Sequence, residues 1–268
     1  MSLAYAAAPA PLYPWEPESA IRANLAIGEL RQLLVKRMSH GNAVPTLLSA
    51  AGSLVGFAAQ NAALEQGELL AQRRDLVAPK SLILYKNPHD ERYLLGSWIN
   101  GPLLTGYGHA FPMLGFLAKA AGGAGLKAAD FPDINAIERR LASAIKEPGF
   151  GRVQPPEGHR LAAPPQDLLK ALWPRARKAL VAPMPVSMAD EPPLDEAHWP
   201  ILLSIVAGML ISVTKDAMAP GPALALVVES ALVASRLDPD LIDPGRWKLA
   251  PGRAGLQIAK AERFRRVG

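Results

Sequence analysis

The sequence predicts a mainly α-helical fold, an α+β protein with one minor β-hairpin beside a multi-helix globular core. Three observations support this fold class. Hydrophobic residues make up 50% of the 268 positions, most long apolar segments show the three-to-four spacing of a helix, and one pair of short segments alternates around a polar turn. A chain of this length can bury roughly 70 to 75% of its unfolded surface, as one large domain or two small ones.

The most apolar stretch covers residues 199–214 and contains no charged side chain. It predicts a helix buried on every side, with Ile205, Met209 and Ile211 in the core. Pro220 to Pro222 separate it from a second apolar helix over residues 223–237, and we expect the two to form an αα-hairpin.

Residues 43–64 and 198–218 share a Pro-x-Leu-Leu-Ser pattern. An internal duplication explains this pattern, as do two unrelated helices with Pro in the first turn.

The N-terminal part begins with a segment, residues 1–18, that is rich in Pro and Ala with interspersed aromatics. We expect an extended arm that packs along the body or across a neighbouring subunit, or a free terminus. Ser19 is a suitable N-cap for a helix to about residue 38. A second helix should run from Pro45 to about residue 74, with Gly52 and Gly56 one turn apart, where another backbone can approach closely.

The strand evidence lies in residues 81–86 and 92–99, which flank the polar connection 87–91. This pattern predicts a β-hairpin with a five-residue turn. Because an isolated hairpin is marginally stable, it must lie on the helices, pair with another strand or add to the same hairpin in a second subunit. The last option favours a homodimer.

The remaining elements are weaker. We expect helices over 112–121, from Asp133 or Asn135 to about 147, over 166–181 with a kink or break at Pro174, and over 256–266, together with an irregular loop at 148–165 and a short strand at 247–249. Such a long loop is functional or disordered in most proteins. The expected organisation is an extended arm at 1–18, a single mainly helical domain at 19–245 and a basic C-terminal tail at 246–268.

The net charge of +5 is concentrated at the C-terminal end. From Arg246 onward the chain has seven basic residues and one acid, which leaves the preceding chain at −1. A nucleic-acid-binding domain spreads its basic residues over one folded face among aromatic or recognition-helix side chains, and this pattern is missing. We therefore expect no specific nucleic-acid partner.

The absence of cysteine excludes disulfides and zinc-thiolate sites and fits a cytoplasmic location. No basic n-region typical of a secretory signal precedes the prolines of the first segment. Residues 43–64 are uncharged and long enough to span a bilayer, but small residues together with Gln60 and Asn61 favour a soluble core helix. Membrane association remains the alternative.

The chain lacks the spacing motifs of phosphate-binding loops, dinucleotide folds, zinc proteases and serine hydrolases. Its five histidines show no metal-ligand spacing. We therefore expect no cofactor and no metal, and whether the protein is an enzyme stays open.

Four polar residues are candidates for ligand binding. Arg152, His159 and Arg160 lie in the 148–165 loop and could form an anion-binding lip, because guanidinium groups pair with carboxylate or phosphate in a fixed geometry. Asn100 follows the predicted hairpin and could present its amide to a ligand. The alternatives are a solvated basic loop and ordinary turn chemistry before Gly-Pro.

Glu229 and His109 are the candidates for a proton-transfer group. Glu229 is the only charged residue between Ala223 and Ser235. A carboxylate on a core helix must pair with a cation, accept hydrogen bonds or be neutralised, unless it lies on a narrow solvent face.

Together with the lack of catalytic motifs, these features suggest a soluble, non-catalytic binding or assembly module that forms a homodimer. The alternative is a metal-independent enzyme or sensor of a small anionic metabolite that uses the 148–165 loop.

Overall fold

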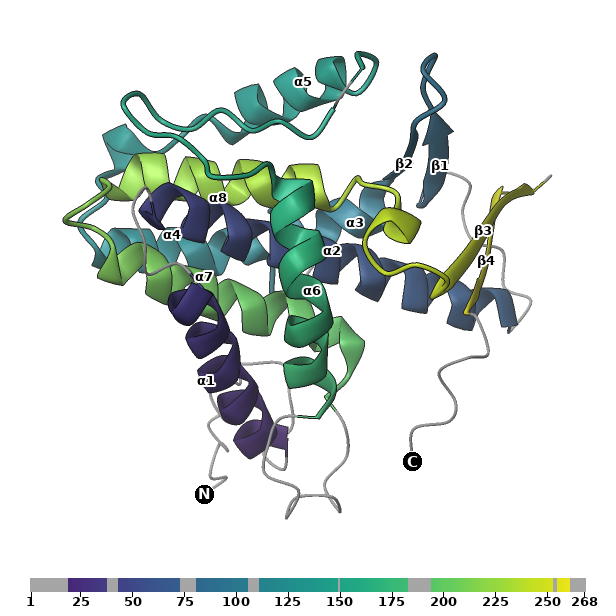
Figure 1. Ribbon diagram of the computed structural model, residues 1–268, viewed down its shortest axis with the longest axis horizontal. Helices are drawn as coiled ribbons and strands as arrows, with labels where there is room; N and C mark the ends of the chain where they lie inside the picture. Colours follow the sequence, from purple (N-terminus) through teal and green to yellow (C-terminus); the bar gives the residue numbers. More distant parts are fainter. Residues whose placement is uncertain are drawn as a thin grey trace, which may run out of the picture.

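The computed structural model (Figure 1) describes residues 19–37, 43–72, 81–105, 111–148, 150–182, 194–252 and 255–260. It confirms a mainly α fold with a minor β part. The elements of this described chain are α1 (Ala20–Arg37), α2 (Ala43–Gln72), β1 (Ile83–Lys86), β2 (Arg92–Leu95), α3 (Ser97–Leu103), α4 (Met113–Gly123), α5 (Ile134–Ala144), α6 (Pro165–Val181), α7 (Trp199–Val213), α8 (Pro220–Ala234), β3 (Trp247–Gly252) and β4 (Gly255–Lys260), with short 3-10 turns between some of them.

Helix α2 is the centre of the core. It has 30 residues, and α6, α7 and α8 all pack against it. Figure 1 shows α7 and α8 running alongside α2, with α1 and α6 crossing them. Its many Ala, Gly and Ser residues keep the helix narrow, so several neighbours can approach it at once.

Gly52 and Gly56 mark the contact between α2 and α8. A Cβ atom on Gly52 would lie 2.2 Å from the Val227 carbonyl oxygen, and one on Gly56 would lie 2.0 Å from that of Ala231. These distances are far below van der Waals contact, so only glycine permits this backbone approach. The predicted close approach of another backbone is confirmed, and that backbone belongs to α8.

The composition of α7 predicted a helix buried on every side, and this prediction is wrong. Ile211 is fully buried, whereas Ile205 is only partly buried and Met209 is 41% exposed. The reason is position, because α7 packs on α2, α4 and α1 and leaves its remaining side open. Although α7 and α8 are consecutive, both pack mainly on α2 and only to a small extent on each other.

The first hairpin forms as predicted, with β1 antiparallel to β2 around residues 87–91. The Asn87 side chain accepts hydrogen bonds from the backbone N–H groups of His89 and Glu91, which closes the turn. Beyond β2, Trp98 and Ile99 belong to α3 and not to a strand. Helix α3 begins after Gly96, whose φ of 144° ends the extended backbone.

The second hairpin differs from prediction. Residues 255–260, expected at the start of a basic helix, form β4 and pair with β3. Leu256 and Ile258 are both buried, so the apolar period here is two rather than three to four. Arg246, counted with the basic tail, is fully buried.

The other helices follow their local sequence signals. Asp133 caps α5, because its side chain accepts a hydrogen bond from the Ala136 N–H. Helix α6 begins with Pro165 and continues through Pro174 without a break. Helix α4 covers the predicted helix at 112–121, and the described residues 150–164 between α5 and α6 contain no regular helix or strand.

Within the part of the chain that the structure describes, two segments have the length and apolar composition of membrane spans. In Val44–Leu69 all of the most apolar window is buried inside the protein, and in Glu196–Val213 61% of it is buried. Core helices of soluble proteins have the same composition, so this is weak evidence for a membrane.

Candidate functional site

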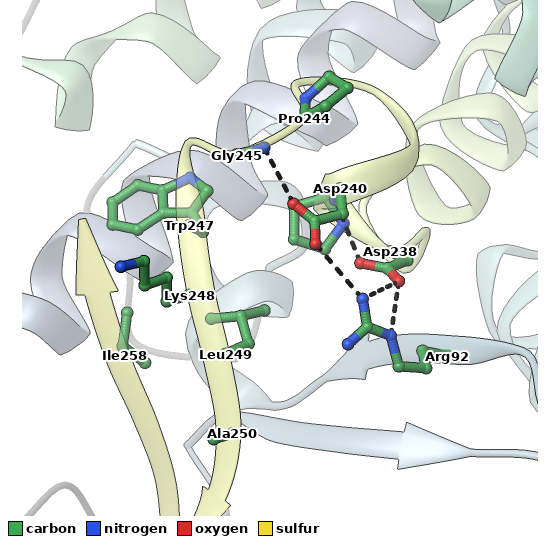
Figure 2. A pocket seen from close by; sticks show the side chains of 11 residues that line it. Arg92, Asp238, Asp240, Pro244, Gly245, Trp247, Lys248, Leu249, Ala250 and Ile258 are labelled. Atoms are coloured by element: carbon green, nitrogen blue, oxygen red, sulfur yellow. Dashed lines mark hydrogen bonds and ion pairs between the residues drawn. The ribbon is translucent and has the colours of Figure 1, made fainter. Parts of the chain in front are cut away.

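A pocket of about 850 Å³ lies between the two hairpins and the loop that follows α8 (Figure 2). Its volume is within the range of small-molecule sites. The lining combines an apolar part from β3 and β4 with a charged side from β2 and the loop; its residues are Arg92, Asp238, Pro239, Asp240, Pro244, Gly245, Trp247, Lys248, Leu249, Ala250 and Ile258.

Main-chain contacts hold β2 against the end of α8 and so position one wall. The N–H of Leu94 donates to the Arg236 carbonyl at 2.9 Å, and Tyr93 bridges to Leu237. The buried side-chain amide of Gln60, on α2, donates to the carbonyls of Ser235 and Leu237. Thus α2 binds the residues at the end of α8, and these residues in turn bind strand β2 of the first hairpin.

Arg92 forms the charged side of the pocket with two aspartates. Its Nε donates to Asp238 Oδ2 at 2.7 Å, and its Nη2 lies 2.6 Å from the same oxygen and 3.5 Å from Asp240 Oδ2. The third nitrogen, Nη1, has no such partner among the described residues, and Figure 2 shows it directed toward Leu249. One guanidinium nitrogen, with its two N–H donors, is therefore left for a ligand.

The two carboxylates are held by the loop itself. Asp238 Oδ1 accepts from the Asp240 N–H, and Asp240 Oδ1 accepts from the Gly245 N–H. Gly245 has φ of 74°, which a glycine adopts without strain. Because both carboxylates already bind structural donors, neither is a ready general base.

Trp247 forms the apolar floor with Leu249 and Ile258, which face each other across the β3–β4 ladder. Trp247 is 3% exposed, and its indole N–H donates to Asn61 Oδ1 on α2 at 3.1 Å. The polar edge of the ring is thus satisfied in the core. Its remaining surface contributes to the pocket.

Arg246 packs against Trp247, which belongs to this floor. Its guanidinium forms ion pairs with Glu196 and, at 3.6 Å, with Asp243, and it lies between the rings of Trp199 and Trp247 at 5.7 and 5.3 Å. A fully buried guanidinium requires such compensation. Burial is the main cause that lowers the pKa of the nearby Arg177, followed by repulsion from Arg246, while Asp243 and Glu196 oppose the shift.

The predicted candidate Glu229 is paired inside the protein. It is 3% exposed on α8, so it does not lie on a solvent face. Its carboxylate forms an ion pair of 2.8 Å with Arg140 on α5 and accepts a hydrogen bond from the Gln154 N–H. Glu229 is therefore the internal ion-pair partner that was one of its predicted roles, and it ties α5 and the 150–164 segment to α8.

The predicted ligand-binding residues do not line this pocket. Arg152 and Arg160 are exposed and His159 is partly buried, all in the segment between α5 and α6. Asn100 lies inside α3, where its carbonyl accepts from the Leu104 N–H. His109 lies outside the described residues.

Sequence reasoning missed Arg92, Asp238 and Trp247 as site residues. Asp238-Pro-Asp240 follows a buried helix and has the composition of a turn, but two acids so close together could also have suggested a paired cation. No local signal joins them to Arg92, which lies 146 positions away. Within the described ranges, no group of three or more His, Asp or Glu side chains could hold a metal ion.

No known protein family, curated protein sequence or solved structure matches this chain.

Proposed function

We propose that the protein is a soluble, cytoplasmic, non-catalytic binding module that holds a small neutral amphipathic molecule between its two hairpins. One observation carries this proposal: Arg92 directs an uncommitted guanidinium nitrogen toward Leu249, in a pocket whose apolar part Trp247 also lines. An acceptor such as a carbonyl group would bind the nitrogen, and a flat or aliphatic body would cover the floor.

The charge balance of the lining favours a neutral ligand. Arg92 is paired with Asp238 and Asp240, and Lys248 is exposed and points away from Arg92 in Figure 2. A free carboxylate ligand would meet a guanidinium that is already neutralised, with Asp240 nearby to repel it. Both lining carboxylates, Asp238 and Asp240, are committed to structural donors, and the Lys248 amine points away from Arg92, so the lining favours binding over catalysis.

The test is a thermal-shift and ligand-observed NMR screen of ring fragments offered as matched neutral amides, carboxylates and amines. We expect neutral amides to dominate the hits. Ala250→Trp, which fills the pocket from exposed β3, should abolish binding, whereas Ala171→Trp on the exposed face of α6 should preserve it. Hits that bind the Ala250→Trp variant equally well would exclude this pocket.

The same screen tests the alternative, a sensor or enzyme for a small anion at the 148–165 loop. That function predicts carboxylate or phosphate hits that disappear in the double variant Arg152→Ala, Arg160→Ala and persist in Ala250→Trp. The exposure of both arginines leaves the loop accessible to such an anion. We also propose that the module is a homodimer, because β1 pairs only with β2 in the described chain and has an edge to which a second copy could add.

A further inference from the structure

A second concavity, of about 720 Å³, lies on the other side of α7 between α1, α4 and α7. We call it the α4–α7 groove. Its walls include Phe116, Ile205, Met209 and Val213, of which Met209 is 41% and Val213 66% exposed. Such exposed apolar side chains at adjoining positions mark a surface that gains from being covered.

The floor of the groove is made of small residues with no spare polar groups. Gly208 packs against Ala120 so closely that a Cβ on it would lie 2.9 Å from the Ala120 Cβ. The hydroxyl of Ser204 donates to the Pro200 carbonyl, and that of Ser212 donates to the Gly208 carbonyl. The occupant must therefore be largely apolar and must not depend on hydrogen bonds to the floor.

The rim of the groove is positive. Arg31 on α1 and Lys119 on α4 both line it, both are exposed, and neither has a carboxylate partner among the described residues. An acidic occupant fits this rim. A second copy of the same face would instead bring two further cations against the first two.

We propose that the occupant is the N-terminal segment of the same chain, residues 1–18. This segment has two acids, Glu16 and Glu18, and no Lys or Arg, so its charge complements the rim. Its apolar side chains include Leu3, Tyr5 and Leu12. Its prolines have no backbone N–H, which reduces the number of donors that an apolar groove would leave unsatisfied.

The connection to α1 makes the segment long enough to reach. Ser19 and Arg31 are separated by about 18 Å along the helix, and the seven residues from Leu12 to Glu18 extend to about 23 Å. The residues before Leu12 can therefore enter the groove. Glu16, three residues before Ser19, can extend about 10 Å toward Arg31, while Glu18 stays near the start of α1. Tethering raises the local concentration of the segment to about the millimolar range, so weak contacts suffice.

The test is photo-crosslinking in the full-length protein. A benzoyl-phenylalanine placed at Met209 should crosslink, within one chain, to peptides from residues 1–18. The same group at Val181, which is 43% exposed on α6, should not. Crosslinks from position 209 only to another part of the chain, only to a second copy or only to phospholipid in added vesicles would overturn the proposal.

Charge reversal adds an independent arm. Glu16→Lys with Glu18→Lys should reduce the yield of the crosslink several-fold, and adding Arg31→Glu with Lys119→Glu should restore it. A yield that does not respond to either change would overturn the proposed charge pairing and with it the choice of this segment.

Discussion

Among single residues, Tyr93 gives the protein a specific response to alkaline pH. Its side chain is 4% exposed, and its hydroxyl donates to Glu91 Oε2 at 2.8 Å. Burial raises the pKa of the Tyr93 phenol well above its usual range, and the hydrogen bond and negative charge of Glu91 raise it further. The folded protein therefore keeps this proton at a pH where the unfolded chain releases it.

The consequence is a loss of stability on the alkaline side. The stabilisation from the protonated phenol is complete below about pH 10, where an unfolded tyrosine titrates, and declines as the pH rises further. Tyr93→Phe should therefore flatten the fall of the unfolding free energy between pH 9 and 11, as measured by urea unfolding. Tyr85→Phe controls for removing a phenol from the same hairpin, and an unchanged slope in Tyr93→Phe would contradict the assignment.

Buried charge also shows what can be read from single residues. Because Glu229 is alone on an apolar helix, the sequence indicated either a buried carboxylate with a partner or a narrow solvent face. The structure shows the first, with Arg140 as the partner. Arg246 gave no such signal, since it stands among other basic residues near the end of the chain. Its burial depends on Glu196, Trp199 and Trp247 together, and their proximity is a property of the tertiary structure.

At the scale of elements, the α2–α8 contact is the most sensitive in the described core. Gly56→Ala would place a Cβ 2.0 Å from the Ala231 carbonyl oxygen, so the two helices would have to separate. We expect a loss of about 1–3 kcal/mol of unfolding free energy or more in chemical denaturation. Gly28→Ala is the matched control, because a Cβ there meets nothing within 4 Å and should stabilise α1 by about 0.5–1 kcal/mol. Equal effects of the two substitutions would rule out this close packing.

Elements were predictable where their signals are local. Asp133 at the N-cap of α5 and the polar turn after Lys86 determine their elements from neighbouring residues alone. Residues 256–260 were not predictable, because a short apolar run fits either period and pairing with β3 decides the outcome. The exposed side of α7 was missed for a similar reason, since composition does not show which neighbours pack against a helix.

At the scale of the whole molecule, the candidate pocket depends on segments that the sequence does not join. It needs β2, the loop after α8 and both strands of the second hairpin, and α2 holds them together through Gln60 and Asn61. In the sequence, these two polar side chains only argue against a membrane span. Their hydrogen bonds explain why two adjacent polar side chains lie in a buried helix of 30 residues.

The outer edge of β1 is the molecular feature that supports a homodimer. In the described chain β1 pairs only with β2, Ile83 at its start is 41% exposed, and its one charged residue, Lys86, is held in an ion pair with Asp90. An edge strand that avoids association is shielded or carries free charge. Pairing of β1 with a second β1 would satisfy its free backbone groups.

We therefore expect light scattering after size-exclusion chromatography to give twice the chain mass of 28.5 kDa at micromolar concentration. Ile83→Lys should shift the protein toward monomer, while Val181→Lys on exposed α6 should not. A strict monomer in the unmodified protein would refute the homodimer, and a dimer that Ile83→Lys leaves intact would place its interface away from β1.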